Sequence, residues 1–491
     1  DEGKGFDVNK HNKDSYYLYN AKDSLGTHQI IKEQKIELEH FGVAHIYDML
    51  IRLMPVYRKM EDTGLLVDDE VRWDLVAKYT SLYEIEKIKL QDLTGQQYLN
   101  PLSSDQMGKL IFEELGFKKI RGVKGTDNDS IETLLEKGEA SRSPIYGKDI
   151  LRSVQAARRI HKVLELLDVP IYPDGRFRGE TNLAGTENGR TSGGTTADQY
   201  FTFYKGKVKM KNYGHSLQTI AKHGFAIDGV TYGKDVRRMF TPDPGYVFVE
   251  IDLKSAEARV DAVLAGNFDI LPIFDTKTGI HRLTGSWVYN CEPDEIKKNV
   301  LVNGVDRYHV AKQVRHAGER NITPEGLISK LVQGLSLQEG RRILDTFHKK
   351  QPEIRGVYHR EVINCINSAR QLVAPNGRFR QFFDRVDNHL YNQAISYIPQ
   401  VVVSDQMKFL GILQMAEKCK DLDFYFLVEA HDGCLALVRE DHVDTYIQRF
   451  NEFVTAPIDF RKCSLSRDFS LVIPVEASIS TTSWYAMEEV D

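Results

Sequence analysis

Two apolar runs that carry aspartates interrupt a chain that is otherwise patterned for helices. Residues 247–252 alternate and are β-branched, which predicts a strand with Asp252 at its end. Residues 425–428 and 434–438 predict a hairpin whose tight turn holds Asp432. Either aspartate alone is readily explained as a turn cap or as the partner of a nearby lysine. The pattern nevertheless places the conspicuous carboxylates of a mostly helical chain on its few strands.

Helical periodicity covers most of the remaining sequence. Apolar residues fall at roughly helical spacing over 28–60 and over 68–118, with a break at Asn100-Pro101. Further helices are predicted over four ranges: 255–266, 307–317, 338–370 and 390–418, the last apart from Pro399. Long helices combined with a few strands predict an α+β fold.

The composition excludes several classes of protein. The 491 residues suggest about two to four domains, and 41% apolar with 27% charged residues is typical of soluble globular chains. No apolar run approaches the ~18 residues of a membrane span, and no secretory leader is visible. The five cysteines are scattered without a CxxC pair, which disfavours a disulfide framework or a zinc site and fits a reducing compartment. The net charge of −5 leaves nucleic acid open, because an enzyme can confine positive charge to one cleft.

Nine short segments, spread along nearly the whole chain, each carry a different motif, and the motifs follow one another in a fixed order. Asp252 is followed five residues later by Glu257, and residues 428–433 hold a histidine-aspartate turn. These two segments resemble motifs A and C of the family A DNA polymerases, the group of bacterial DNA polymerase I and many phage replicases. The other seven resemble that family's remaining motifs: M-E-x-x-G-x-x-x-D at 60–68, T-x-x-G-R-x-S at 186–192, N-L-Q-N-I at 216–220, D-I-H at 279–281, motif B at 312–320, the G-R-x-R segment at 377–380, and the helix with Gln400 and Asp405.

The resemblance implies a right-hand polymerase fold, an α+β architecture with an antiparallel palm sheet and helical fingers and thumb. It predicts five regions in chain order: a remnant of an exonuclease-like domain with connecting helices (1–58), the thumb (59–165), the first part of the palm with motif A (166–267), the fingers with motif B (268–350), and the second part of the palm with motif C (351–491).

The two aspartates suit phosphoryl transfer. That reaction develops charge on the attacking 3′ oxygen and on the leaving pyrophosphate, and two Mg²⁺ ions can stabilise both. By resemblance, Asp252 and Asp432 are the catalytic metal ligands, the carbonyl of Leu253 is a third, and Mn²⁺ is a possible substitute for Mg²⁺. Motif C often has a second acid after its aspartate, and here Gly433 replaces it.

The resemblance also assigns the nucleotide site. Glu257 would be the steric gate that excludes a ribose 2′ hydroxyl, although a solvated glutamate paired with Arg259 or Lys254 is the alternative. The other expected contacts to the nucleotide are the following residues: His281, Arg307, Lys312, His316 and Arg320. Lys312, His316 and Arg320 are spaced to share one helix face, which without the resemblance indicates only a charged surface.

Motif B departs from the family at two places. The family's arginine lies four residues before the lysine, whereas Arg307 lies five before Lys312. The family's tyrosine and glycine are replaced by Arg320 and Asn321. We expect Arg320 to face the nucleotide and to add positive charge near the triphosphate or a template phosphate. The alternative is that Pro324 ends the helix early and Arg320 points to solvent.

Five residues are expected to contact primer–template DNA: Arg190, Gln218, Arg378, Gln400 and His431. Polar contacts to the backbone or minor groove suit an enzyme that accepts every sequence. For Arg378 a purely structural role is a strong alternative. The expected partners are therefore primer–template DNA and deoxynucleotides, with a separate exonuclease portion or a replisome subunit as further candidates and no membrane. The expected location is the cytoplasm of a bacterial or phage-infected cell, at DNA.

Tyr19 and Asp23 form a Y-x-x-x-D that resembles the last motif of a proofreading 3′–5′ exonuclease. That site also needs a D-x-E, and the 18 residues before Tyr19 contain none. We therefore expect no exonuclease activity in this chain, and we expect it to be part of a longer or split protein. Two alternatives to a DNA polymerase remain: a single-subunit RNA polymerase, against which Glu257 argues, and a degenerate protein that grips primer–template without extending it.

Overall fold

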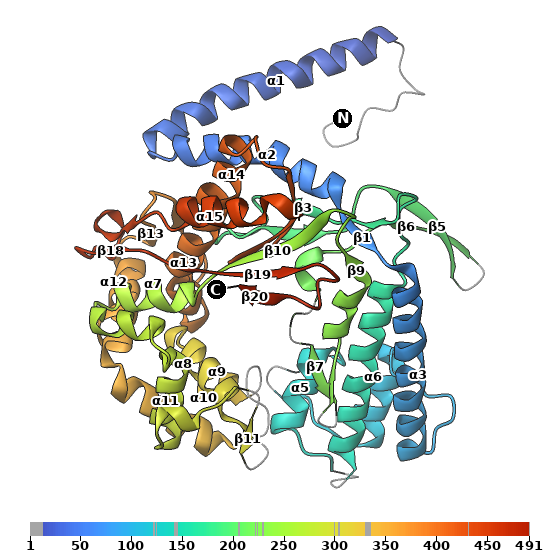
Figure 1. Ribbon diagram of the computed structural model, residues 1–491. Coiled ribbons are helices and arrows are strands. Elements are labelled where there is room, and N and C mark those ends of the chain that lie inside the picture. The colour runs from blue at the N-terminus through green and yellow to red at the C-terminus, as the bar shows by residue number, and fades with distance from the viewer. Residues whose placement is uncertain are drawn as a thin grey trace.

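A five-stranded antiparallel sheet lies at the centre of the molecule (Figure 1). The computed structural model describes residues 13–120, 123, 125–141, 146–204, 207–220, 222, 224–227, 230–298, 300–302, 305–328, 335–430 and 432–490. The sheet has the order β15 (Phe424–Ala430), β16 (Gly433–Arg439), β10 (Tyr246–Leu253), β19 (Val475–Ser480) and β20 (Glu488–Val490).

The register of this sheet confirms the predicted strand and hairpin. β10 and β16 run antiparallel from Tyr246 opposite Arg439 to Asp252 opposite Gly433. β15 and β16 form the hairpin, with Ala430 opposite Gly433. No local pattern predicted β19, which pairs along the other edge of β10 with Leu253 opposite Val475. The central strand β10 is thus held on both sides, and Asp252 lies at its rigid end.

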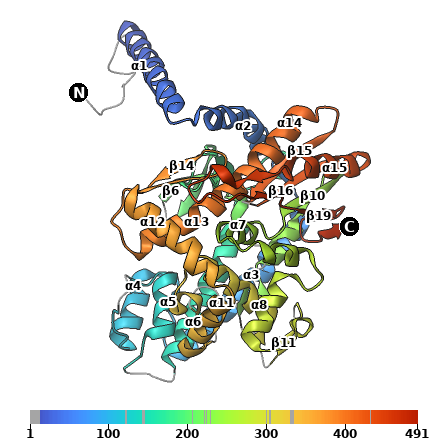
Figure 2. The same cartoon turned by 90° about the vertical axis from the view of Figure 1, so that its left-hand side faces the viewer.

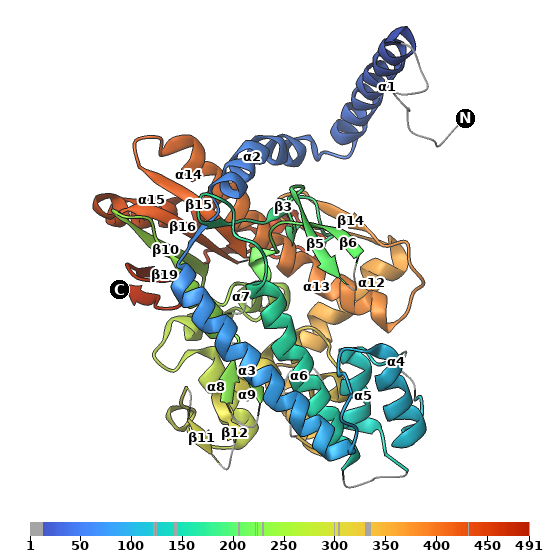
Figure 3. The ribbon, with the colours of Figure 1, turned by 90° about the vertical axis from the view of Figure 1, so that its right-hand side faces the viewer.

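The helices α1 (Lys13–His40) and α2 (Ala44–Thr63) precede the sheet. They confirm the helices predicted over 28–60. α2 packs against β15, whereas α1 projects away from the rest of the chain (Figures 2 and 3). Most residues of α1 are exposed.

Two helical blocks flank the space below the sheet in Figure 1. The first contains α3 (Asp69–Thr94), α4 (Ser104–Gly108), η1 (Lys109–Glu114), α5 (Asn128–Lys137) and α6 (Gly147–Leu167). α3 and α6 pack along each other, and the block has a separate hydrophobic core (Figure 3). The second contains η4 (Phe268–Asp275), α8 (Gly279–Tyr289), η5 (Pro293–Glu295), α9 (Arg307–Glu319), α10 (Pro324–Gly326) and α11 (Leu337–Lys350). The first block spans 69–167 and overlaps the range predicted for the thumb, and the second spans 268–350, the range predicted for the fingers; both assignments stay predictions.

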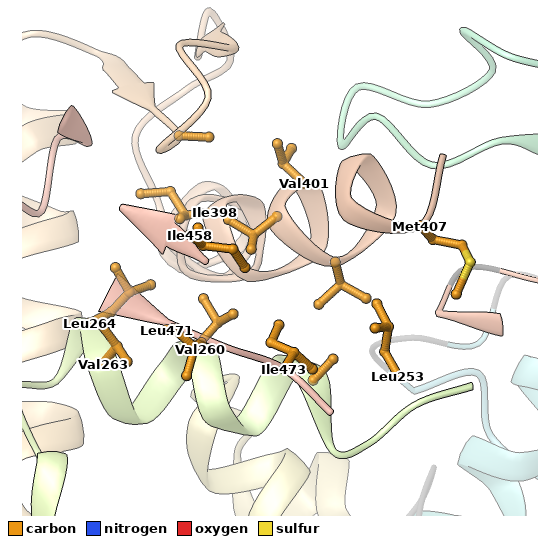
Figure 4. Packing of buried hydrophobic residues seen from close by; sticks show 14 of the residues in the cluster. Leu253, Val260, Val263, Leu264, Ile398, Val401, Met407, Ile458, Leu471 and Ile473 are labelled. Atoms are coloured by element: carbon orange, nitrogen blue, oxygen red, sulfur yellow. The ribbon is translucent and has the colours of Figure 1, made fainter. Parts of the chain in front are cut away.

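The main hydrophobic core joins the sheet to the helices beside it. α7 (Ala256–Leu264) packs against α13 (Asn388–Asp405), and Figure 4 shows part of this shared core, which includes Val260 of α7 and Ile398 of α13. Further helices complete this layer: η7 (Ile354–His359), α12 (Arg360–Ser368), η8 (Gln406–Ile412), α14 (Leu413–Lys418), η9 (Glu440–His442), α15 (Val443–Val454) and η10 (Phe460–Lys462). Because α7 directly follows β10, this packing also fixes the end of the strand that carries Asp252.

The predicted interruption at Pro399 is wrong, since α13 continues through it. Proline has no backbone N–H and therefore leaves the carbonyl four residues earlier without its helical donor. That carbonyl belongs to Ile395, and the buried hydroxyl of Tyr358 donates a hydrogen bond to it. A side chain from a neighbouring helix thus replaces the missing donor.

Short strands connect these layers. β1 (Leu65–Val67) pairs with β2 (Arg176–Phe177) and β9 (Phe240–Thr241). Two-stranded ladders pair β3 (Glu180–Asn182) with β4 (Ser192–Gly194), β5 (Gln199–Tyr204) with β6 (Lys207–Asn212), β7 (Phe225–Ile227) with β8 (Val230–Tyr232), β11 (Leu301–Val302) with β12 (Val305–Asp306), β13 (Gln371–Val373) with β14 (Phe379–Gln381), and β17 (Ile458–Asp459) with β18 (Ser470–Leu471). The short helices η2 (Leu217–Thr219) and η3 (Lys234–Met239) lie between them. Within the part of the chain described, no helix is long and apolar enough to cross a bilayer.

Candidate active site

The two predicted metal ligands meet at the end of the central sheet. Asp252 is paired with Gly433, the residue after Asp432, and the backbone N–H of Leu253 donates to the carbonyl of Asp432 over 2.9 Å. A Cβ atom at Gly433 would overlap the carboxylate of Asp252. The absence of a side chain at position 433 therefore gives the Asp252 carboxylate its place beside the turn.

The charge of Asp252 acts on the carboxyl group of Asp432. Asp432 is exposed to solvent, but protein atoms crowd around its carboxyl group. This crowding, as the larger cause, and the nearby charge of Asp252, as the second, raise the pKa of Asp432 to about 6. A carboxyl group held this close to an anion is harder to ionise. The site is therefore short of positive charge.

A lysine that the sequence did not single out partly supplies that charge. Lys222 Nζ lies 2.7 Å from Asp252 Oδ2 and 3.5 Å from Glu250 Oε2. Arg237 approaches the other oxygen of Glu250 at 3.8 Å. Nothing in the local sequence marks Lys222, because its role depends on a contact 30 residues away along the chain.

The donor set fits a hard divalent cation. Two carboxylates at a rigid strand end, one of which already attracts an ammonium group, offer the oxygen ligands that Mg²⁺ prefers. Magnesium takes few protein ligands and completes its shell with water and phosphate. Among the described residues, no group of three or more histidine, cysteine, aspartate or glutamate side chains is arranged to hold a metal ion. The carbonyl of Leu253 stays a predicted third ligand.

Glu257 lies in the first turn of α7 and is held at both of its carboxylate oxygens. Arg190 Nη2 donates to Oε1, and Arg320 Nη2 donates to Oε2 over 2.5 Å. Burial alone would raise the pKa of Glu257, but the charges of Arg320 and Arg190 outweigh it and lower the pKa to about 2. Glu257 is therefore an ion-paired carboxylate at neutral pH, and not the solvated glutamate of the alternative interpretation.

Arg320 does not follow the alternative interpretation, and its expected contact with the nucleotide stays a prediction. It caps the C-terminal end of α9 and is only 4% exposed, so it does not point to solvent. Its Nη1 lies 2.7 Å from both oxygens of Asp261, which is 0% exposed. With Glu257 as a second partner, the charge of Arg320 is matched by two carboxylates. Because both carboxylates compensate its charge, Arg320 does not add net positive charge for a triphosphate in this arrangement.

The rest of α9 presents Lys312 and His316 on one exposed face, as their spacing predicts. Crowding by protein atoms and then the charge of Arg320 lower the pKa of His316. Arg307 begins the helix, and its guanidinium lies 4.9 Å from the ring centre of Tyr289 in α8. This contact joins the start of α9 to the end of α8.

His281, in the first turn of α8, belongs to the same surface. Its ring meets that of Tyr308 edge to face, with 5.8 Å between the centroids. Burial, followed by the positive charges of Arg315 and Lys312, lowers the pKa of His281 to about 3. His281 is therefore a neutral imidazole at physiological pH and can act only through hydrogen bonding or stacking.

Four of the five predicted DNA contacts surround one loop, residues 183–191, between β3 and β4. This loop carries Arg190, and its Asn188 donates to Gln400 over 2.6 Å. Gln218 donates to Thr191 Oγ1 over 2.6 Å and to the carbonyl of Glu429 over 3.0 Å. The fifth residue, His431, lies outside the described residues.

Arg378 has a buried anchor near this loop. Its Nε and Nη2 donate to the two oxygens of Asp405 at 2.7 and 3.0 Å. Lys408, fully buried, lies 3.5 Å from Asp405 and donates to the carbonyl of Gly189. This arrangement favours a structural role for Arg378 in holding the loop, which the sequence left open, and it does not test a DNA contact.

Comparison with known proteins identifies the family. The family model for DNA polymerase family A matches residues 78–486. The chain belongs to this family. It is 24% identical over 481 residues to the DNA polymerase I of Chloroflexus aurantiacus, which covers 94% of this chain and 45% of that protein. It is 21% identical over 408 residues to the thermostable DNA polymerase I of Thermus thermophilus, with 80% of this chain and 43% of that protein covered.

The fold of this family A chain is similar to that of the polymerase domain of Pol1 from M. smegmatis, solved in complex with DNA primer-template and dNTP. The TM-score is 0.72 at 19% identity, and the match covers 92% of this chain and 73% of that one. The predicted right-hand fold is thereby confirmed. The chain spans less than half the length of the curated relatives named above. The domain boundaries and the roles of individual residues stay predictions.

Proposed function

We propose that this chain is a template-directed DNA polymerase that adds deoxynucleotides to a primer 3′ end. The observation that carries the proposal is the placement of Asp252 and Asp432 together at the end of β10. Membership of the family supports it. Primer–template DNA and deoxynucleotides are the proposed substrates, and the cytoplasm, at DNA, is the proposed location.

Asp252 and Asp432 would hold two Mg²⁺ ions, with the Leu253 carbonyl as a further ligand and Mn²⁺ as a substitute. Bound there, the ions would lower the energy of the charge that develops on the attacking and leaving oxygens. The chain's own contribution is rigidity: β10 is paired on both sides, so the Asp252 carboxylate keeps its position during the reaction. Lys222, which pairs with Asp252, would have to give up this contact to a bound cation.

The nucleotide would be bound by residues of α7, α8 and α9. Lys312 and Arg307 would neutralise phosphate charge, and His316 would add a polar contact on the same face. His281 would act as a neutral imidazole. Glu257, clamped by two arginines, would occupy the space of a ribose 2′ hydroxyl. Arg190, Gln218, Arg378, Gln400 and His431 are the proposed DNA contacts.

A primer-extension assay with Mg²⁺ and four deoxynucleotides tests the proposal. Asp252→Asn and Asp432→Asn should each abolish extension while duplex binding stays close to that of the parent, because each removes a metal ligand and no DNA contact. Asp441→Asn is a matched control, since this aspartate lies just past the far end of the same hairpin in an exposed pair with Arg439. Normal extension by either active-site variant would refute the metal assignment. Equal use of ribonucleotides by the parent would favour an RNA polymerase, and binding without extension would favour a degenerate binding protein.

A further inference from the structure

Glu257 is one member of a chain of alternating charges that links three parts of the molecule. The chain runs from Asp261 to Arg320, on to Glu257, and ends at Arg190. Asp261 and Glu257 lie one helical turn apart on α7, where two like charges repel each other. Arg320 from the end of α9 lies between them, and Arg190 comes from the loop between β3 and β4.

We propose that Asp261 is a positioning residue for sugar selection: through Arg320 it fixes the Glu257 carboxylate in one orientation and so sets how strongly ribonucleotides are excluded. The inference deepens the role of Glu257 proposed above and rests on it. Asp261 itself is completely buried, so it would act through Arg320.

The geometry of Arg320 explains how Asp261 acts at a distance. A guanidinium is a planar fork, so fixing one terminal nitrogen determines where the other points. Asp261 accepts from Nη1 with both of its oxygens at 2.7 Å, which leaves Nη2 aimed at Glu257. A lysine at position 320 would keep the charge but would lack the second arm.

Sugar exclusion of this kind requires a side chain that stays in place. A free glutamate samples many rotamers, and ordering such a side chain has an entropic cost. In this chain the ordering is provided before the nucleotide arrives, because Arg320 and Arg190 each hold one oxygen of Glu257. Loss of the Asp261 anchor would let Arg320, and with it Glu257, move aside for a 2′ hydroxyl.

The test compares kcat/KM for a deoxynucleotide and the matching ribonucleotide in single-nucleotide incorporation by the full chain. Asp261→Asn, which keeps the side-chain size and removes the charge, should reduce the discrimination ratio about tenfold, the lower end of what pocket shape provides. The reduction should come mainly from faster ribonucleotide incorporation. Arg320→Lys should reduce the discrimination ratio in the same way. Glu257→Ala removes the gate itself and therefore gives the maximum loss of discrimination.

Glu319→Gln is the matched control. Glu319 is a buried carboxylate at the same end of α9, and it is directed to Arg315 at 2.8 Å rather than into the Asp261–Arg320–Glu257 chain. Its loss should lower the melting temperature and leave the sugar ratio unchanged.

The possible outcomes separate the inference from the proposal on which it rests. Loss of discrimination in Glu257→Ala but not in Asp261→Asn or Arg320→Lys would overturn the inference and leave the gate in place. An unchanged ratio in Glu257→Ala would remove the gate itself. A fall in Glu319→Gln as large as in Asp261→Asn would mean that general loosening of α9 is the cause, and would also overturn the inference.

Discussion

Restoring the family's tyrosine at position 320 should destabilise this protein. In Arg320→Tyr, Asp261 loses the guanidinium that contacts both of its oxygens at 2.7 Å, while remaining completely buried. Removing one partner of a buried ion pair typically costs about 3–5 kcal/mol, because the other charge stays buried without compensation. A tyrosine hydroxyl can donate to only one oxygen, so we expect a loss near the lower end, about 3 kcal/mol.

A double-mutant cycle isolates this effect. Replacing a buried ion pair by apolar residues of similar volume is often neutral. Asp261→Leu combined with Arg320→Tyr should therefore recover most of the stability that Arg320→Tyr loses alone. Thermal unfolding is the assay, and the comparison uses the first transition, because a chain of several domains does not unfold in two states. For a unit of about 150–250 residues, 3 kcal/mol corresponds to a shift of about 6–12 °C.

Arg449→Tyr provides a control with the same geometry in solvent. Arg449 Nη1 lies 2.7 and 2.8 Å from the two oxygens of Asp421, but both side chains are substantially exposed. Water screens an exposed ion pair, which therefore contributes little to stability, so this variant should melt close to the parent. The reasoning is refuted if Arg320→Tyr is as stable as Arg449→Tyr, or if Asp261→Leu gives no recovery in the Arg320→Tyr background.

Three further predictions concern the two aspartates. The pKa of Asp432 is about 6 in the folded protein, above its unfolded value, so the metal-free protein should lose stability from this group as the pH rises from about 4 to 6. The Mn²⁺ affinity measured by calorimetry should increase over the same pH range, because the ionised carboxylate is the metal ligand. Asp432→Asn should flatten both pH profiles, and parallel profiles in variant and parent would contradict the assignment. Lys222→Met removes the ammonium that pairs with Asp252, so Mn²⁺ should bind several-fold more tightly; an unchanged dissociation constant would show that Lys222 does not compete. Gly433→Ala should displace the Asp252 carboxylate, because a Cβ atom at position 433 would overlap it. Mn²⁺ binding and primer extension should therefore weaken together. Parent-like values for both measurements would show that the Asp252 carboxylate adapts freely.

Local pattern in the sequence is sufficient to predict several parts of this protein. Alternation predicted β10, and two apolar runs predicted the β15–β16 hairpin, because strands and tight turns are encoded within a few residues. Helical spacing likewise predicted α9 and the shared exposed face of Lys312 and His316. The order of the nine motifs along the chain indicated the family, and the family model confirms it.

Which charges meet depends instead on the packing of the folded chain. Helical spacing placed Arg320 on the face of Lys312 and His316, but such spacing is the same whether a side chain meets solvent, a nucleotide or a buried carboxylate. Asp261 compensates Arg320 across 59 residues of sequence, and Lys222 reaches Asp252 across 30. The continuity of α13 through Pro399 similarly depends on a hydroxyl from another helix. Partners of this kind are set by distances in the folded chain, and no local pattern in the sequence records them.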